Sequence, residues 1–105
     1  MKDLVLKVAD KVNGTPGGRY KKNGKYSGEE FYEKYLLPSF RNAQDGGGKL
    51  VIDFDGCFGY PSSFLDESFG KLGREYGGKK ILKTIEFISN DQPGLVKEVQ
   101  SMIAR

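Results

Sequence analysis

The 105-residue sequence predicts a small single-domain α/β fold over residues 1–105, with helices packed on one sheet in two or three layers. The first observation is the apolar run from Leu50 to Phe54, which carries one acid and is typical of a strand covered on both faces. The second is that apolar strands alternate with amphipathic helices along the chain. The third is that the connections are short, which favours right-handed crossovers.

The expected order of elements is strand, loop, helix, strand, helix, strand, helix. The first strand is expected from Leu4 to Val8, where apolar residues dominate. A turn-rich basic loop follows at 14–27, because Asn-Gly, Pro and Gly-Gly interrupt regular structure there. This loop leaves room for at most a short strand near 19–22.

The first helix is expected to begin after this loop and to run toward Gln44. Ser27 and Glu30 have the spacing of a capping box, in which each side chain bonds the backbone amide of the other residue. Pro38 should kink or restart the helix, because proline has no amide hydrogen to donate to the preceding turn. The three glycines at 46–48 then end it.

The second helix is expected to begin at Ser62 or Ser63, with either serine as its N-cap, and to end at Gly77 and Gly78. A strand is expected from Ile81 to Ile88, and Asp91 is expected to cap the last helix. The inward faces of these two helices carry apolar residues at helical spacing: Leu65, Phe69, Leu72 and Tyr76, then Leu95, Val99, Met102 and Ile103.

The composition excludes several classes of site. A hydrophobic share of 37% and a charged share of 30% indicate a folded domain rather than a disordered one. Histidine is absent, which removes Ser-His-Asp and Cys-His catalysis and imidazole metal sites, so neither a metal nor another cofactor is expected. Cys57 is the single cysteine and is expected to be an unreactive bystander. With no apolar leader or membrane-spanning run in the sequence, a cytoplasmic protein without a membrane partner is expected.

The central strand delivers two carboxylates, Asp53 and Asp55, to the loop that precedes the serine pair. Two acids at this end of a strand can bind magnesium in phosphoryl transfer, and Asp-Phe-Asp-Gly is similar to the first motif of haloacid-dehalogenase-type phosphatases. A small magnesium-dependent phosphatase is therefore one alternative. The favoured interpretation is structural: Asp53 accepts hydrogen bonds from loop or helix-cap amides, and Asp55 shapes the turn.

The loop and the serine pair that follow offer candidates for recognition. A serine at a helix start is usually only a cap, but a phosphate added there gains backbone donors and a favourable dipole. Ser62 and Ser63 are therefore candidate contact or modification residues. Phe58 and Tyr60 are candidate anchors for a partner protein, because aromatic side chains on rigid loops dominate many interfaces. Burial of these rings beneath the edge of the sheet is the equal alternative.

Several short motifs resemble a STAS-like family of unassigned function from bacteria and phages. The motifs are Gly-x-Arg-Tyr, Ser-Gly-Glu-x-Phe, Leu-x-Pro, and Asp-h-Asp-Gly with Gly-Tyr-x-Ser-Ser-Phe-Leu, where h is apolar. They lie at Gly17–Tyr20, Ser27–Phe31, Leu36–Pro38, Asp53–Gly56 and Gly59–Leu65, so the resemblance covers roughly residues 14–75. It implies a fold distantly similar to the anti-sigma-factor antagonists, in which a partner kinase phosphorylates a serine at the start of the helix after the central strand.

A basic segment gives a second possible site. It holds four positive charges and no acid among Arg19, Tyr20, Lys21, Lys22, Lys25 and Tyr26. Basic side chains interleaved with aromatic ones suit a phosphate backbone and stacked bases, so nucleic-acid or phospholigand binding is an alternative function. The other interpretation is a solvated loop. Arg19 is singled out because it could reach an anion at the serine helix start, either a phosphate or Asp53.

The leading prediction is a non-enzymatic regulatory module that binds a partner protein, such as a kinase-like ATPase or a regulatory factor, through the loop and helix start at 56–66. Serine phosphorylation would switch the binding, and the oligomeric state is left open. The candidate residues for this site are Ser62, Ser63, Tyr60, Phe58, Asp53, Asp55, Arg19 and Tyr20.

Overall fold

A three-stranded parallel sheet organises the computed structural model, which describes residues 3–105. The strands are β1 (Leu4–Lys7), β2 (Leu50–Asp53) and β3 (Ile85–Ile88), and they lie in the spatial order β1-β2-β3. Helices connect them, so the predicted α/β fold class is confirmed. Within the described range, no helix is both long and apolar enough to cross a membrane.

The first long helical stretch comprises α2 (Gly28–Phe31), the π-helical turn η2 (Tyr32–Leu36) and α3 (Leu37–Asp45). Its predicted cap is confirmed, because the Ser27 side chain accepts a hydrogen bond from the Glu30 amide at 3.0 Å. The predicted restart at Pro38 is also confirmed. Pro38 lies in the first turn of α3, directly after the π-helical turn, where a missing amide hydrogen is tolerated.

The second long stretch comprises α4 (Ser62–Leu65), the π-helical turn η3 (Asp66–Gly70) and α5 (Lys71–Tyr76). It starts where predicted, but neither serine is its N-cap. Pro61 occupies the cap position with extended backbone, so both serines lie inside the first turn, and no side chain caps the helix.

The strand predicted from Ile81 to Ile88 is wrong in its first half. Gly77 has a φ of 90°, which ends α5, and a new helix α6 (Gly78–Thr84) follows before β3. Ile81 and Ile85 are both buried, and their four-residue spacing fits one face of a helix as well as a short apolar run. The last helix, α7 (Leu95–Ala104), has Gly94 rather than Asp91 at its N-cap.

Two short segments near the N-terminus also differ from the prediction. The first strand ends one residue early, because Val8 opens a helix, α1 (Val8–Val12), whose valines enter the core. This helix ends at Asn13, which adopts a left-handed conformation. The short strand considered near 19–22 is instead a 3-10 turn, η1 (Lys21–Asn23).

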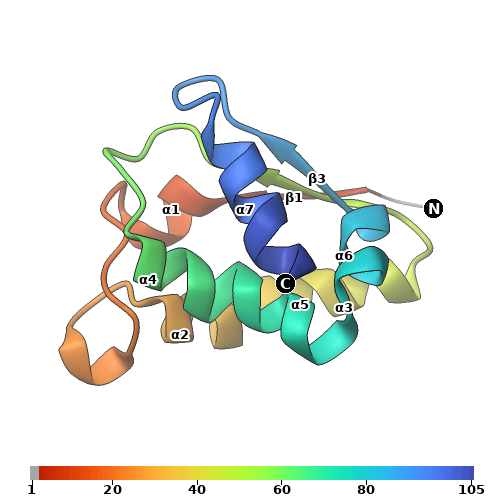
Figure 1. Ribbon diagram of the computed structural model, residues 1–105, viewed down its shortest axis with the longest axis horizontal. Coiled ribbons are helices and arrows are strands. Elements are labelled where there is room, and N and C mark those ends of the chain that lie inside the picture. Colours follow the sequence, from red (N-terminus) through yellow and green to blue (C-terminus); the bar gives the residue numbers. More distant parts are fainter. Residues whose placement is uncertain (1–2) are drawn as a thin grey trace.

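One face of the sheet is covered by helices. Helices α2 to α5 lie on one side of the sheet (Figure 1), where Leu6, Leu50 and Ile52 are buried. The prediction that the central strand is covered on both faces is wrong, because β2 alternates between buried and half-buried residues. In a parallel sheet whose strands lie in consecutive order, right-handed crossovers place both helical connections on the same face.

The core between the sheet and the helices is rich in aromatic rings. Its fully buried phenylalanines are Phe31, Phe40, Phe54, Phe64 and Phe69. The two long helical stretches approach closely at Gly28, where an added Cβ would lie 2.5 Å from the Phe64 carbonyl oxygen. This contact fixes the start of α4 against the start of α2, and with it the position of the serine pair.

Candidate functional site

The loop that follows β2 is held at its base by two carboxylates. Asp53 accepts a hydrogen bond from the Asp55 amide at 2.9 Å, which turns the chain out of the strand. Asp55 in turn accepts bonds from the amides of Asn90, at 2.7 Å, and of Asp91, at 2.9 Å. The pKa of Asp55 is lowered from its ordinary value, first by the Asp91 amide and then by the two Asn90 donors.

A further hydrogen bond joins the same two loops in the opposite direction: the Gly56 amide donates to the Asp91 carboxylate at 3.0 Å. Sequence reasoning missed Asn90 and Asp91 as partners of this loop. The signal was available: both residues directly follow the end of β3, and the carboxyl ends of neighbouring parallel strands meet at one edge of a sheet.

These bonds bear on the phosphatase alternative. They match the structural interpretation of Asp53 and Asp55, since both carboxylates accept backbone amides of the loops. Among residues 3–105, no three His, Cys, Asp or Glu side chains are grouped as a metal site would require. The arrangement is one that stabilises a loop.

Tyr60 and Phe58 have opposite roles in this loop. The Tyr60 ring packs edge-on against Phe54, at 5.2 Å between centroids, and its hydroxyl donates to the Phe54 carbonyl at 2.7 Å. Burial raises the pKa of Tyr60, and burial also raises the pKa of the Cys57 thiol beside it, which keeps that thiol protonated. The Phe58 side chain is 95% exposed. Of the two predicted anchors, Phe58 is exposed and Tyr60 is half-buried.

The two serines differ in accessibility. Ser62 is exposed and Ser63 is half-buried. In the described part of the chain, neither hydroxyl makes a hydrogen bond. Ser62 is therefore the more accessible of the two candidate modification sites.

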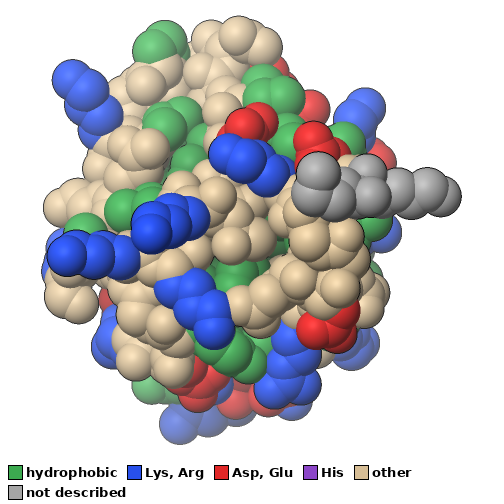
Figure 2. Space-filling view, turned by 90° about the vertical axis from the view of Figure 1, so that its right-hand side faces the viewer, with side chains coloured by type: hydrophobic (Ala, Val, Ile, Leu, Met, Phe, Trp, Pro, Cys, Tyr) green, Lys and Arg blue, Asp and Glu red, His purple; other side chains and the backbone are tan. Residues whose placement is uncertain are grey.

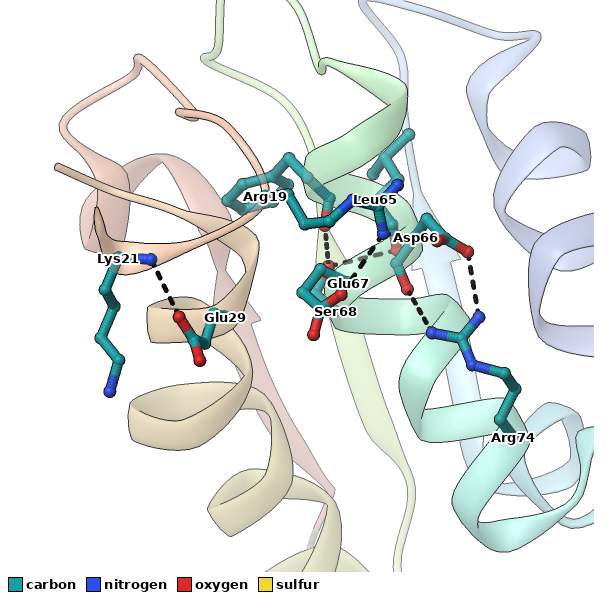
Figure 3. A network of polar contacts seen from close by, with 9 residues as sticks. Arg19, Lys21, Glu29, Leu65, Asp66, Glu67, Ser68 and Arg74 are labelled. Atoms are coloured by element: carbon teal, nitrogen blue, oxygen red, sulfur yellow. Dashed lines mark hydrogen bonds and ion pairs between the residues drawn. The ribbon is translucent and has the colours of Figure 1, made fainter. Parts of the chain in front are cut away.

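Arg19 lies close to the serine helix, but the carboxylates it binds do not include Asp53. Its guanidinium donates to Asp66 at 2.6 Å and to Glu67 at 3.3 Å (Figure 3). Arg74 contacts the other oxygen of Asp66 at 3.0 Å. The pKa of Asp66 is lowered, chiefly by the bond from Arg19. The prediction that Arg19 binds Asp53 is wrong: it ties the basic loop to η3, one helical turn after Ser62.

Two of the four cations in the basic segment, Arg19 and Lys21, pair with acids of other elements. The Lys21 ammonium pairs with Glu33 at 2.7 Å, and its backbone amide donates to Glu29. The Lys22 ammonium lies 5.7 Å from the centre of the Tyr20 ring. Tyr20, Lys22 and Glu29 line a shallow depression of about 280 Å³.

The last two residues of the basic segment also have different surroundings. Lys25 is exposed, whereas Tyr26 packs against the core with a φ of 59°. Figure 2 shows the end of the molecule opposite the basic loop, where lysines, arginines and several acids are scattered over the surface. The site residues thus form two groups, the loop with the serine pair and the basic loop, joined through Asp66 and Arg19.

The comparison with protein families matches residues 27–95 to the STAS-like domain of unknown function (DUF4325). The matched range includes β2, the loop, both serines and β3, and it leaves Arg19 outside. No curated protein and no solved structure is significantly similar to the chain. Because the match spans more than half of the sequence, the predicted resemblance is confirmed, and the chain belongs to this STAS-like family.

Proposed function

We propose that this domain is a non-enzymatic regulatory module that binds a partner protein through the 56–66 surface, which comprises the loop after β2 and the start of α4. The observation that carries the proposal is Phe58, whose side chain is 95% exposed. Burying a phenylalanine contributes roughly 1.5–3 kcal/mol. In the isolated domain the Phe58 ring stays in water, so this free energy of burial is available to stabilise a complex with a partner that has an apolar pocket.

The hydrogen bonds that hold the loop after β2 in place support this proposal. Asp53, Asp55 and Asp91 each bond a backbone amide, and the Tyr60 hydroxyl bonds the Phe54 carbonyl. A loop ordered in advance loses less conformational entropy when it binds. Phe58 is thus presented as a pre-organised anchor rather than as the tip of a mobile segment.

The serine pair supplies the proposed switch. A phosphate on Ser62 would add a charge of about −1.5 to −2 next to the anchor loop. It would lie one helical turn before Asp66, where it would repel that carboxylate and compete for Arg19. We therefore propose that phosphorylation weakens partner binding and draws the basic loop toward the serine. The family resemblance suggests a kinase-like ATPase or a regulatory factor as the partner.

The proposal is tested by quantitative affinity capture from the native host, comparing wild type with Phe58→Ala and with Ser62→Glu. The sequence makes Tyr20 a candidate for this site, but it lies on the basic loop outside the proposed 56–66 surface. Tyr20→Ala is therefore the control, because Tyr20 is also an aromatic residue on a loop and is 40% exposed. We expect the same protein to be captured by wild type and by the control, and to be lost with Phe58→Ala. Ser62→Glu should reduce its recovery, whereas Ser62→Ala should not.

Two outcomes would contradict the proposal. Equal recovery with wild type and Phe58→Ala would exclude the loop as the binding surface. Equal recovery with Ser62→Glu would exclude the switch while leaving the surface in place. Circular dichroism of each variant should show an unchanged melting curve, because Phe58 and Ser62 are exposed.

A further inference from the structure

Within residues 3–105, the face of the sheet that points away from α2 to α5 is uncovered. Its residues are the alternate positions of the three strands: Val5 and Lys7, Val51 and Asp53, and Glu86 and Ile88. None of them is buried, and Val5 is 64% exposed. Parallel sheets in known folds are almost always covered on both faces. In the part of the chain that the structure describes, this face therefore lacks the layer that a parallel sheet normally has.

The charges on this face follow a regular pattern. Along the first strand it reads Asp3, Val5, Lys7, and along the central strand it reads Lys49, Val51, Asp53. The ion pair between Lys49 and Glu86, at 3.4 Å, confirms that the residue before β2 also lies on this side. When the residue just before each strand is included, both segments have a valine in the middle and opposite charges at their two ends. The Asp3 carboxylate also accepts a hydrogen bond from the Lys49 amide at 2.8 Å.

This pattern is complementary to itself. A two-fold axis that lies in the plane of the face, perpendicular to the strands and through the valine row, places each strand antiparallel to its own copy. Asp3 then faces Lys7 of the second copy, and Lys49 faces Asp53 of the second copy. Val5 and Val51 face their own equivalents at the axis. Glu86 faces its own equivalent, which is a like-charge contact, and its ion pair with Lys49 of the same chain uses the ammonium that also faces Asp53 of the second copy.

We infer that the uncovered face is a homodimer interface, in which a second copy of this chain provides the missing layer. The face is small: three strands of four residues span about 14 Å by 13 Å, from ordinary strand spacing and rise. A stable interface buries about 800 Å² from each partner. The dimer is therefore weak and concentration-dependent. Its surface is distinct from the 56–66 surface, so the inference does not rest on the proposed function.

Analytical ultracentrifugation of the wild-type chain, from micromolar to about 1 mM, tests the inference. A reversible monomer–dimer equilibrium is expected. Val5→Lys and Val5→Glu should each raise the dimer dissociation constant by about tenfold or more, because each places like charges opposite each other at the axis. An equimolar mixture of these two variants should dimerise again, since a lysine then faces a glutamate. Both variants should remain folded, because Val5 is on the surface.

The mixing experiment distinguishes the two-fold arrangement from any other packing of two chains. Rescue in the mixture is expected only if residue 5 faces residue 5 of the second copy. A wild-type chain that stays monomeric at 1 mM would overturn the inference and leave the face to a different protein. A dimer unaffected by either Val5 variant, or two weakened variants without rescue, would overturn the proposed interface. Phe58→Ala should dimerise as wild type does, which separates a failure here from a failure of the partner surface.

Discussion

Truncation to alanine should destabilise the domain strongly at Phe54 and hardly at all at Phe58, four residues later. Phe54 is 1% exposed, and its ring lies within 6 Å of the rings of Tyr60, Phe69 and Phe87. Phe58 is 95% exposed. Replacing each by alanine therefore tests, within one short segment, which side chain supports the fold and which is available for recognition.

The expected magnitudes differ by a wide margin. Phe54→Ala removes a fully packed ring and leaves a cavity, which costs about 3–5 kcal/mol. This is a large share of the roughly 5–15 kcal/mol by which small domains are stable. Phe58→Ala removes a solvated ring, so its effect should stay within about 0.5 kcal/mol. In a domain of this size, each kcal/mol shifts the melting temperature by about 4–8 °C.

Urea unfolding followed by far-ultraviolet circular dichroism measures both variants. We expect Phe54→Ala to lower the free energy of unfolding with little change in the denaturant slope, and Phe58→Ala to give the wild-type curve. Similar losses for the two variants would refute the reasoning, because they would mean that the Phe58 ring is packed in solution.

Three further predictions concern the rest of the molecule. The pKa of Asp66 is lowered below its ordinary value of 3.8. The stability that the ionised Asp66 contributes is therefore complete above pH 3.8 and is lost as the pH falls through the folded-state pKa. Asp66→Asn should remove this part of the acid dependence of unfolding. Gly28→Ala should cost about 1–3 kcal/mol in chemical denaturation, because the new Cβ meets the Phe64 carbonyl oxygen. In fluorescence anisotropy, single-stranded oligonucleotides should bind weakly, and reversing the charges of Lys21 and Lys22 should change little.

Each of these has a clear contrary result. An unchanged acid profile in Asp66→Asn would mean that its ion pairs are not formed in solution. A stable Gly28→Ala variant would contradict the close contact between α2 and α4. Steep salt dependence of oligonucleotide binding, lost on charge reversal of Lys21 and Lys22, would favour the nucleic-acid alternative.

The sequence predicts the fold class because its strongest patterns are local. The apolar run of β2, the capping serine Ser27 and the helical spacing around Phe69 each act over a few residues. The boundary between α6 and β3 was not predictable in this way. Ile81, Leu82 and Ile85 fit a helix and a strand equally well, and the break at Gly77 decides between them.

The candidate site was predictable in its location but not in its contacts. The position of the loop and of the serine pair follows from the end of a buried strand. The partner of Arg19 could not be predicted from the sequence, because a flexible cation can reach any acid on a neighbouring helix. In the structure, η3 offers Asp66 and Glu67. Tyr60 and Phe58 are both aromatic residues of one glycine-rich loop, and only packing separates the half-buried ring of Tyr60 from the exposed ring of Phe58.

Site-specific photo-cross-linking tests the central claim most directly. A benzophenone amino acid placed at Phe58 should form an adduct with one host protein, and Ser62→Glu in the same chain should diminish that adduct. The same probe at Tyr20 should give no such product. An adduct that forms equally from both positions, or none from Phe58, would contradict recognition through this loop.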